Sequence, residues 1–420
     1  MGHEGARYAA RAPPDAGCLP RPLRPERAHL RRTVVPVERL WQSAIVEIDR
    51  LEQLRALLAR GGALGGVRLQ DLDLHAVEEQ LLDRTDVTDL VVLGGRLSPA
   101  LTLHLIRHGA IVFPSDPKAP VEVYRARLYT ADELYAGLSG PLGYAGTPDA
   151  RAFDWTMDRR SGRDAYVTML RAIHDESMTD TLDEVLDGLP VVGVMGGHEA
   201  QRGSGVYAAA ARLGHLLAEG GCVVATGGGP GAMEAANLGA YAVSPADLDA
   251  AIAALSKVPS YRPDVGPWAE LGLRVREQLG RRPDSGELRG LPLRSIGIPT
   301  WFYGHEPPNV FGQGIAKYFS NALREDGLLA RCTAGTVVLP GAAGTVQEIF
   351  QGVTRLYYGR LADPTGTLPP LVLVGRSHWQ RLVPTWPLVT ALAGNRPMAE
   401  VVHLVDTIEE AAAILLPSAD

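Results

Sequence analysis

The stretch CVVATGGGPGAMEAANLGAYA, residues 222–242, decides the fold. It begins with a short apolar segment typical of a buried strand, passes through a glycine-rich turn and continues as an alanine-rich helix. Glycine lets the backbone approach a ligand closely, and the free N–H groups at the start of a helix attract anions. The stretch therefore predicts a strand–turn–helix unit of a parallel sheet with an anion site at its turn.

The same pattern recurs on both sides of this stretch. Strands are predicted at residues 191–195, 222–225, 295–303, 336–339 and 371–374, and helices at 207–219, 231–242, 310–329, 346–357 and 408–416. Short apolar strands that alternate with helices predict an α/β fold, a Rossmann-like doubly wound parallel sheet covered on both faces. Residues 244–290, rich in Pro, Arg and Asp, interrupt the alternation and are expected to form a lid or an interface insertion.

The length of 420 residues predicts more than one domain. Helices at 40–58 and 101–108, with strands at 89–93 and 110–114, predict a smaller N-terminal α/β domain. The expected order is a disordered basic tail at 1–32, the small domain at 33–138, a linker at 139–163 and the Rossmann-like domain at 164–420.

Composition excludes several function classes. Lys and Arg number 41 against 48 Asp and Glu, a net charge of −7, which argues against general nucleic-acid binding. The 3 cysteines form no CxxC pair, so neither a zinc site nor a disulfide framework is indicated, and a reducing cytoplasm is expected. No apolar run has the length that a membrane span requires.

Three glycine turns are predicted at the carboxyl ends of strands, where parallel sheets bind ligands. They are Gly196-Gly197-His198, the segment 226–233 and the segment 339–348. None has the GxGxxG dinucleotide pattern or the GxxxxGK[ST] phosphate loop. A single turn of this kind is as readily structural as functional, so a second observation is needed.

Glu348 supplies that observation. It lies about one helical turn past the third glycine turn, so its side chain can point back toward a ligand bound there. A glutamate in the first turns of a helix is also favoured by the helix dipole alone. The alternative interpretation is a catalytic carboxylate.

The two larger turns together carry a family resemblance. GGGPGAM…AAN, followed by PGxxGTxxE, resembles the LOG (Lonely Guy) family of nucleotide phosphoribohydrolases over roughly residues 190–374. The segment Glu306-Pro307-Pro308-Asn309 resembles the larger bacterial nucleotide 5′-monophosphate nucleosidases, formerly misannotated as lysine decarboxylases. The family pattern PGGxGTxxE has Ala342 here in place of its second glycine.

The resemblance implies roles for individual residues. Glu348 is the implied catalytic carboxylate, and Arg324, on the helix before the motif strand, is the implied catalytic arginine, with Arg331 as the alternative. The residues implied to bind substrate or phosphate are Gly196, Gly197, Gly228, Gly229, Gly231, Met233, Asn309, Gly341, Gly344 and Thr345.

The implied reaction is hydrolysis of the N-glycosidic bond of a nucleoside 5′-monophosphate to free base and ribose 5-phosphate, with no metal or cofactor. His305-Glu306 is followed by two prolines, which excludes an HExxH metal helix. The resemblance also implies a homo-oligomer and a regulatory nucleotide bound by the N-terminal domain. The alternative is a non-catalytic nucleotide sensor or a molybdenum-cofactor carrier of the same fold. Amino-acid decarboxylation is not supported, since no lysine has a pyridoxal-phosphate context.

Overall fold

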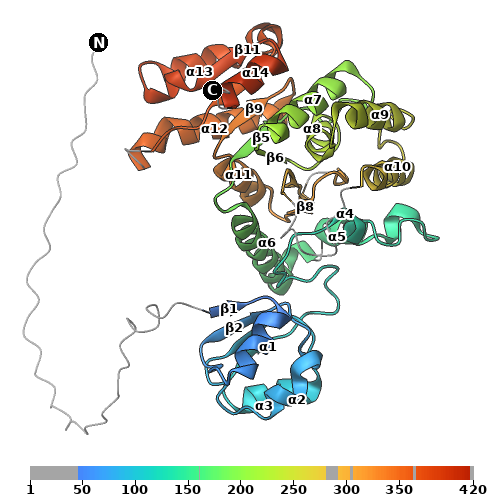
Figure 1. Cartoon of the computed structure of the whole chain (residues 1–420), viewed down its shortest axis with the longest axis vertical. Helices are drawn as coiled ribbons and strands as arrows, with labels where there is room; N and C mark the ends of the chain where they lie inside the picture. The colour runs from blue at the N-terminus through green and yellow to red at the C-terminus, as the bar shows by residue number, and fades with distance from the viewer. Residues whose placement is uncertain (1–45, 160, 281–291, 303–305, 363–365, 417–420) are drawn as a thin grey trace, which may run out of the picture. The chain divides into compact units, whose positions relative to one another are not determined.

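The computed structural model describes residues 46–159, 161–280, 292–302, 306–362 and 366–416. These residues form two parallel sheets (Figure 1). The smaller sheet has the order β1-β2-β3-β4, with strands Val46–Ile48, Val67–Gln70, Val91–Leu93 and Ile111–Phe113. Its helices are α1 Leu51–Ala59, η2 Leu74–Val77, α2 Glu78–Leu82 and α3 Pro99–Arg107.

The larger sheet has seven strands in the order β11-β10-β9-β5-β6-β7-β8, all parallel. The strands are β5 Val191–Met195, β6 Val223–Thr226, β7 Ser295–Gly297, β8 Gly314–Ile315, β9 Gly335–Val338, β10 Leu371–Val374 and β11 Val402–Val405. Apart from β8, this is the doubly wound Rossmann order, in which successive strands are added in one direction from the first strand and then in the opposite direction from the fourth. The reversal falls between β5 and β9, so the loops that follow these two strands flank the position where ligands bind in such folds.

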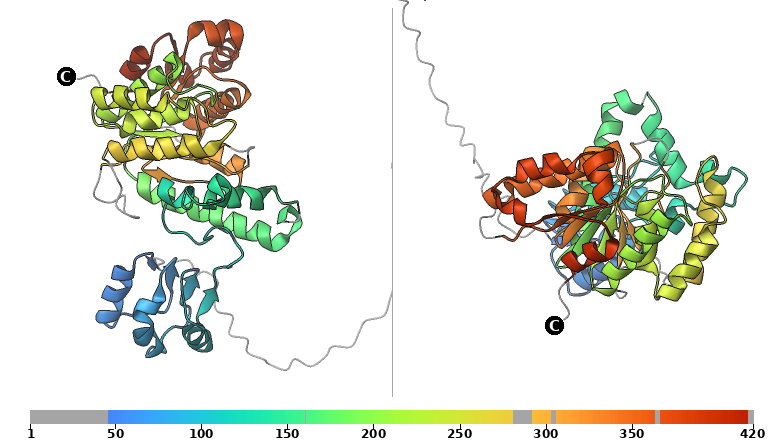
Figure 2. Two further views of the ribbon diagram at one scale, coloured as in Figure 1. Left: turned by 90° about the vertical axis from the view of Figure 1, so that its right-hand side faces the viewer. Right: turned by 90° about the horizontal axis from the view of Figure 1, so that it is seen from above.

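Helices cover this sheet on both faces (Figure 2), because right-handed crossovers in opposite directions place them on opposite sides. α7 Gly205–Glu219 packs against α8 Ala232–Tyr241 and α14 Ile408–Leu415 (Figure 1). α12 Ala343–Ala362 packs against α11 Asn321–Arg331 and α13 Trp386–Ala393. The predicted fold class is confirmed.

The remaining elements are α4 Ala131–Leu134, η3 Gly143–Gly146, α5 Pro148–Met157, η4 Ser161–Arg163, α6 Ala165–Leu186, α9 Pro245–Leu255, α10 Val265–Gln278, η5 His378–Leu382 and η6 Pro397–Glu400.

Two separate apolar cores accompany the two sheets. One cluster of buried side chains runs from Ile48 to Ala110, and the other runs from Leu128 to Leu415. Residues 128–138, assigned from sequence to the small domain, pack in the larger core. The domain boundaries themselves remain a prediction. Among the described residues, no helix combines the length and apolar character that crossing a bilayer requires.

Three predicted segments differ in the structure. Within 40–58, β1 occupies Val46–Ile48 and the helix begins only at Leu51, while residues 40–45 lie outside the described residues, as does the predicted tail. Within 310–329, the glycine-containing first half adds β8 to the sheet edge, and the helix begins at Asn321, where Ser320 caps it. The strand predicted at 295–303 ends at Gly297.

The segment 139–163, predicted as a linker, contains a packed helix. Thr147 caps α5 by accepting from the N–H of Ala150, and Pro148 occupies its first turn. Asp149 is buried and its carboxylate binds the ammonium group of Lys317 at 2.6 Å. The polar composition of this segment hid the helix, because Thr147 and Asp149 are buried and hydrogen-bonded inside the protein rather than solvated.

Candidate functional site

Three loops converge where the strand order reverses. The N–H of Leu339 donates to the carbonyl of Met195 (2.9 Å), and the N–H of Gly197 donates to the carbonyl of Pro340 (3.4 Å). The N–H of Ala232, at the start of α8, donates to the carbonyl of Gly197 (3.1 Å). These bonds join the loops that follow β5, β6 and β9 into one surface, which brings the three predicted glycine turns together.

The turn after β6 needs glycine at its last position. Gly231 is the N-cap of α8 and has φ of +74°, which disfavours any residue with a side chain. A β-carbon there would also lie 2.6 Å from the carbonyl oxygens of Gly197 and His198. The glycine therefore lets the first and second loops pack backbone to backbone.

Two buried asparagines hold this turn from behind. Asn309 donates from its side chain to the carbonyl of Gly229 (3.2 Å) and to Oδ1 of Asn237 (2.9 Å). Oδ1 of Asn237 also accepts from the hydroxyl of Thr226 (2.6 Å). Asn309 is 1% exposed, so the structure places its amide in the support of the turn. Its predicted contact with substrate stays a prediction.

The turn after β9 leads directly into α12. Ala342 accepts the first helical hydrogen bond, from the N–H of Val346 at 3.0 Å. A β-carbon at Gly341 would collide with the side chain of Thr345, which is buried under the turn. Ala342 and Gly344 are exposed, so the methyl group that replaces the family's second glycine meets no crowding from the interior. The N–H groups of this helix start are thus available to an anion.

Arg324 and Glu348 meet beside the turn after β6. Their closest atoms, Nη1 and Oε1, are 3.4 Å apart, and their side chains are 8% and 13% exposed. A β-carbon at Gly227 would lie 3.6 Å from Nη1 of Arg324, so the guanidinium lies against the turn. The side chain of Met233 lies along the same turn, with Sδ 2.8 Å from that position.

The alternative arginine points elsewhere. The guanidinium of Arg331 binds the carboxylate of Asp183 at 2.7 Å and donates to the carbonyls of Gly327 and Thr179. It therefore ties the end of α11 to α6. Of the two arginines named from sequence, Arg324 is the one that pairs with Glu348.

Burial raises the pKa of Glu348 to about 7, even though the Arg324 guanidinium lowers it; the carboxylates of Glu325 and Glu306 raise it further. Glu325 is itself buried and accepts hydrogen bonds from the side-chain amides of Asn321 (2.7 Å), Gln347 and Gln351 (3.3 Å). A carboxyl group with a pKa near neutrality can exchange protons at physiological pH, as general acids and bases do.

Two further site residues were not predicted as such. Nδ1 of His198 lies 3.2 Å from Oε1 of Glu306. Oε2 of Glu306 lies 3.3 Å from the position that a β-carbon would take at Gly229. The side chains are 40% and 26% exposed, so both are accessible. In the sequence they stood out only as parts of segments: His198 ends the first glycine turn, and Glu306 begins the segment 306–309 that contributes to the family resemblance.

Ring nitrogen Nε2 of His378 approaches the third turn and lies 3.0 Å from the carbonyl oxygen of Gly341. Within the described part of the chain, no group of three or more His, Cys, Asp or Glu side chains is arranged to hold a metal ion.

A comparison with protein families matches one part of the chain. Residues 189–245, which contain β5, α7, β6 and α8, match the model of the SLOG cluster4 family. A search of curated proteins found no match. The family match and the parallel sheet topology are consistent with a LOG-like family.

Solved structures that resemble the chain have low sequence identity. A molybdenum cofactor binding protein from the phototrophic bacterium Rippkaea orientalis is 18% identical, with 54% of this chain and 96% of that one covered and a TM-score of 0.31. The molybdenum cofactor carrier protein of Chlamydomonas reinhardtii is 17% identical, with 54% and 94% covered and a TM-score of 0.30. The TM1055 protein is 17% identical, with 54% and 98% covered and a TM-score of 0.31. Likeness at this level leaves the function of this chain open.

Proposed function

We propose that this protein hydrolyses the N-glycosidic bond of nucleoside 5′-monophosphates to give free base and ribose 5-phosphate. The observation that carries the proposal is the Arg324–Glu348 pair, buried against the glycine turn at the carboxyl edge of the sheet. It joins a carboxylate and a guanidinium to the start of α12, which suits an anion. That set of groups matches the needs of a phosphorylated sugar.

The 5′-phosphate binds at the start of α12. Exposed Ala342 and Gly344 leave its N–H groups open, and the positive end of the helix dipole favours a negative charge there. Arg324, whose planar guanidinium can donate two parallel hydrogen bonds, orients the ribose and Glu348.

Glu348 acts on the sugar. Breaking the C1′–N bond builds positive charge on the ribose, and a carboxylate close to the ring stabilises that charge. As water adds to C1′, the ionised carboxylate takes a proton from it, and the electron pair of the broken bond leaves with the base. A pKa near 7 suits this role, because the group then accepts and returns a proton readily at neutral pH.

The test is product analysis with AMP, GMP, CMP, UMP and IMP. We expect free base and ribose 5-phosphate in equal amounts from at least one nucleotide, with no orthophosphate. Arg324→Lys, which keeps the charge and loses the planar fork, should reduce the rate by about tenfold or more.

An alternative outcome is recognisable in the same samples. Tight binding of a nucleotide without release of base would contradict hydrolysis. It would instead favour a nucleotide sensor or a carrier of a nucleotide-like cofactor.

A further inference from the structure

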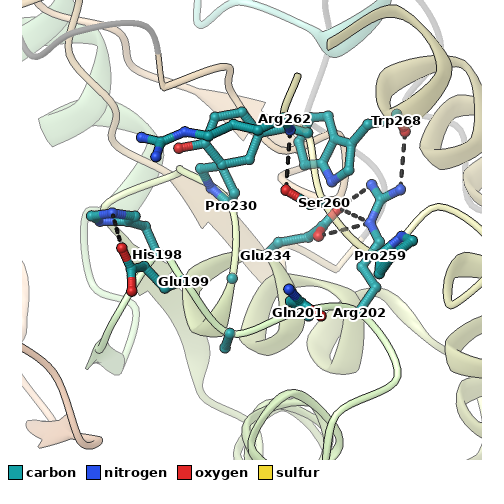
Figure 3. Close-up of a pocket in the computed structure, with 13 residues that line it drawn as sticks. His198, Glu199, Gln201, Arg202, Pro230, Glu234, Pro259, Ser260, Arg262 and Trp268 are labelled. Atoms are coloured by element: carbon teal, nitrogen blue, oxygen red, sulfur yellow. Dashed lines mark hydrogen bonds and ion pairs between the residues drawn. The ribbon is translucent and has the colours of Figure 1, made fainter. Parts of the chain in front are cut away.

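A polar cavity opens beside the glycine turn that follows β6. It has a volume of about 210 Å³ and lies between Pro230–Gly231 and the segment 259–268, which includes the end of the connection from α9 and the first turn of α10 (Figure 3). Its lining includes His198, Gln201, Ser260 and Arg262. The Arg324–Glu348 pair is not part of it, so the mechanism above leaves this cavity without a role.

One wall of the cavity is a buried ion pair. Nε of Arg202 lies 3.0 Å from Oε2 of Glu234, and Nη1 donates to the carbonyl of Trp268 (3.0 Å; Figure 3). The guanidinium carbon also lies 4.4 Å from the centre of the Trp268 ring. The two charged side chains are 1% and 0% exposed. Because every charge in this wall is partnered, the cavity is formed before any ligand arrives.

The glycine turn connects this cavity to the ribose site. Gly227 lies against Arg324, Gly229 lies against Glu306, and Gly231 lies against the backbone of His198. These positions span four peptide units, at most roughly 14 Å of extended chain. A ligand that follows the turn away from Glu348 therefore passes Glu306 and His198 and reaches the cavity.

The cavity is sized for part of a nucleotide. Pockets for drug-sized ligands hold roughly 300–1,000 Å³, whereas this one holds about 210 Å³. Its wall offers the amide of Gln201, the hydroxyl of Ser260 and the guanidinium of Arg262, which are hydrogen-bonding groups of both kinds. Such a lining suits the polar edge of a heterocyclic base.

We propose that this cavity receives the base of a purine nucleoside 5′-monophosphate, and that His198, oriented by Glu306, donates the proton with which the base departs. The inference rests on the proposed hydrolysis. A purine is indicated because N7 gives it a basic ring nitrogen away from the glycosidic bond, which a proton donor at the cavity mouth can use. Glu306 is a positioning residue: its carboxylate at Nδ1 leaves Nε2 as the donating nitrogen. Nε2 lies 3.9 Å from Oε1 of Glu199, whose side chain is exposed and free to move aside for the base (Figure 3).

The proton balance closes. His198 gives a proton to N7 as the C1′–N bond breaks, and the bonding electrons leave with the base. Water forms the new bond to C1′ and gives its proton to Glu348. Solvent then returns that proton to His198, so the net reaction consumes one water and needs no co-reactant.

The cavity is tested first by binding, independently of turnover. Ala200, which lines the cavity, is changed to Trp in the inactive Glu348→Gln protein, and the affinities for AMP, GMP and ribose 5-phosphate are measured by calorimetry. We expect the affinity for AMP or GMP to fall by about tenfold or more, while that for ribose 5-phosphate stays within about twofold. Ser260→Phe is the second filling variant, and thermal unfolding confirms that each is folded. Equal affinities in filled and unfilled proteins would overturn the base site.

The proton donor is tested by changing the leaving group. N7-methylated GMP carries a cationic base that departs without protonation. His198→Asn should lower the rate on GMP by about 10²-fold and the rate on N7-methylated GMP far less. The matched control is His75→Asn, since His75 is similarly exposed and also lies beside a carboxylate, that of Asp73 at 2.9 Å.

Three results would contradict the inference. Equal losses on both nucleotides would exclude proton donation by His198, and cleavage of CMP and UMP alone would exclude the purine assignment. If the wild-type protein releases no base at all, the proposed hydrolysis and the proton donor both fail. In that case the calorimetric comparison still decides whether the cavity binds a base.

Discussion

Glu348 is the residue at which function and stability conflict. Its carboxyl group is held mostly away from water, with one guanidinium at 3.4 Å and a second carboxylate, that of Glu325, close by. Burial of this kind destabilises the ionised form of the Glu348 carboxyl group. Such an arrangement is typical of a group retained for chemistry rather than for folding.

Replacing Glu348 by Gln should therefore stabilise the protein in a pH-dependent way. The folded pKa of about 7 lies above the usual value of 4.5, so the stability that the protonated carboxyl contributes is fully present below pH 4.5 and is lost as pH rises through 7. Gln does not titrate. The stability gained by Glu348→Gln should grow between pH 5 and pH 8, by at most about 3 kcal/mol.

Thermal unfolding across this pH range provides the measurement. Glu409→Gln, an exposed change on α14, serves as the control and should keep the wild-type pH dependence. A stability difference for Glu348→Gln that is constant, or that shrinks toward pH 8, would show that the carboxyl is not held in the way described.

Individual site residues differed in how far the sequence could predict them. Arg324 and Glu348 could be named because the motif, the helix and the strand that place them are local in the chain. The pairing of His198 with Glu306 could not, since it depends on how two loops from distant parts of the sequence close on the same turn. Asn309 was predicted to contact substrate, whereas its hydrogen bonds to Gly229 and Asn237 could be seen only in the structure.

At the scale of elements, the contact between α7 and α8 fixes the position of the glycine turn. A β-carbon at Gly239 of α8 would collide with the carbonyl of Ala211 on α7, and one at Gly214 of α7 would collide with the carbonyl of Ala236 on α8. The two helices therefore touch through their backbones. Because the turn leads directly into α8, any shift of this helix moves the turn.

Gly239→Ala should be destabilising by about 1–3 kcal/mol or more, since the methyl group has no space and the helices must separate. Gly352→Ala on α12 is the matched control: a β-carbon there meets nothing within 4 Å, and the change should be neutral or stabilising by about 0.5–1 kcal/mol. Denaturant unfolding measures both. A Gly239→Ala protein as stable as wild type would contradict the close helix contact.

Element types followed from sequence where the apolar pattern was strong, as in β5, β6, β9 and β10. Prediction failed for β8 and α5, for opposite reasons. β8 has only two residues and forms because the sheet edge accepts them. α5 is polar on its surface, and it depends on the Thr147 cap and on the buried pair of Asp149 and Lys317. Neither feature produces the repeating apolar pattern by which a helix is predicted from sequence.

At the scale of the whole molecule, the insertion predicted at 244–290 packs its apolar side chains in the large core, and an arginine from outside it adds a polar link. Arg202 lies in the loop after β5, pairs with Glu234 of α8 and donates to the carbonyl of Trp268 in α10. The composition of the insertion indicated an added element. The hydrogen bond from Arg202 to Trp268 could be found only from the structure. Residues 281–290 of the insertion lie outside the described residues.

Arg202→Met should cost about 3–5 kcal/mol, because it leaves the Glu234 carboxylate buried without a partner. The double variant Arg202→Met/Glu234→Leu should recover most of that loss. Arg274→Met is the control, since its pair with Glu270 is exposed and is worth only about 0.3–0.5 kcal/mol. If the single and double variants unfold alike, the loss of stability does not come from leaving Glu234 buried without a partner.

The central claim is that Glu348 cleaves a nucleotide at the carboxyl edge of the large sheet. The most direct test compares release of free base from nucleoside 5′-monophosphates by the wild-type protein and by Glu348→Gln at pH 7.5, with Glu409→Gln as the control. The predicted result is equal amounts of base and ribose 5-phosphate from the wild-type protein and a rate about 10²–10⁴-fold lower for Glu348→Gln. Base release that Glu348→Gln leaves unchanged, or nucleotide binding with no base release by the wild-type protein, would contradict the claim.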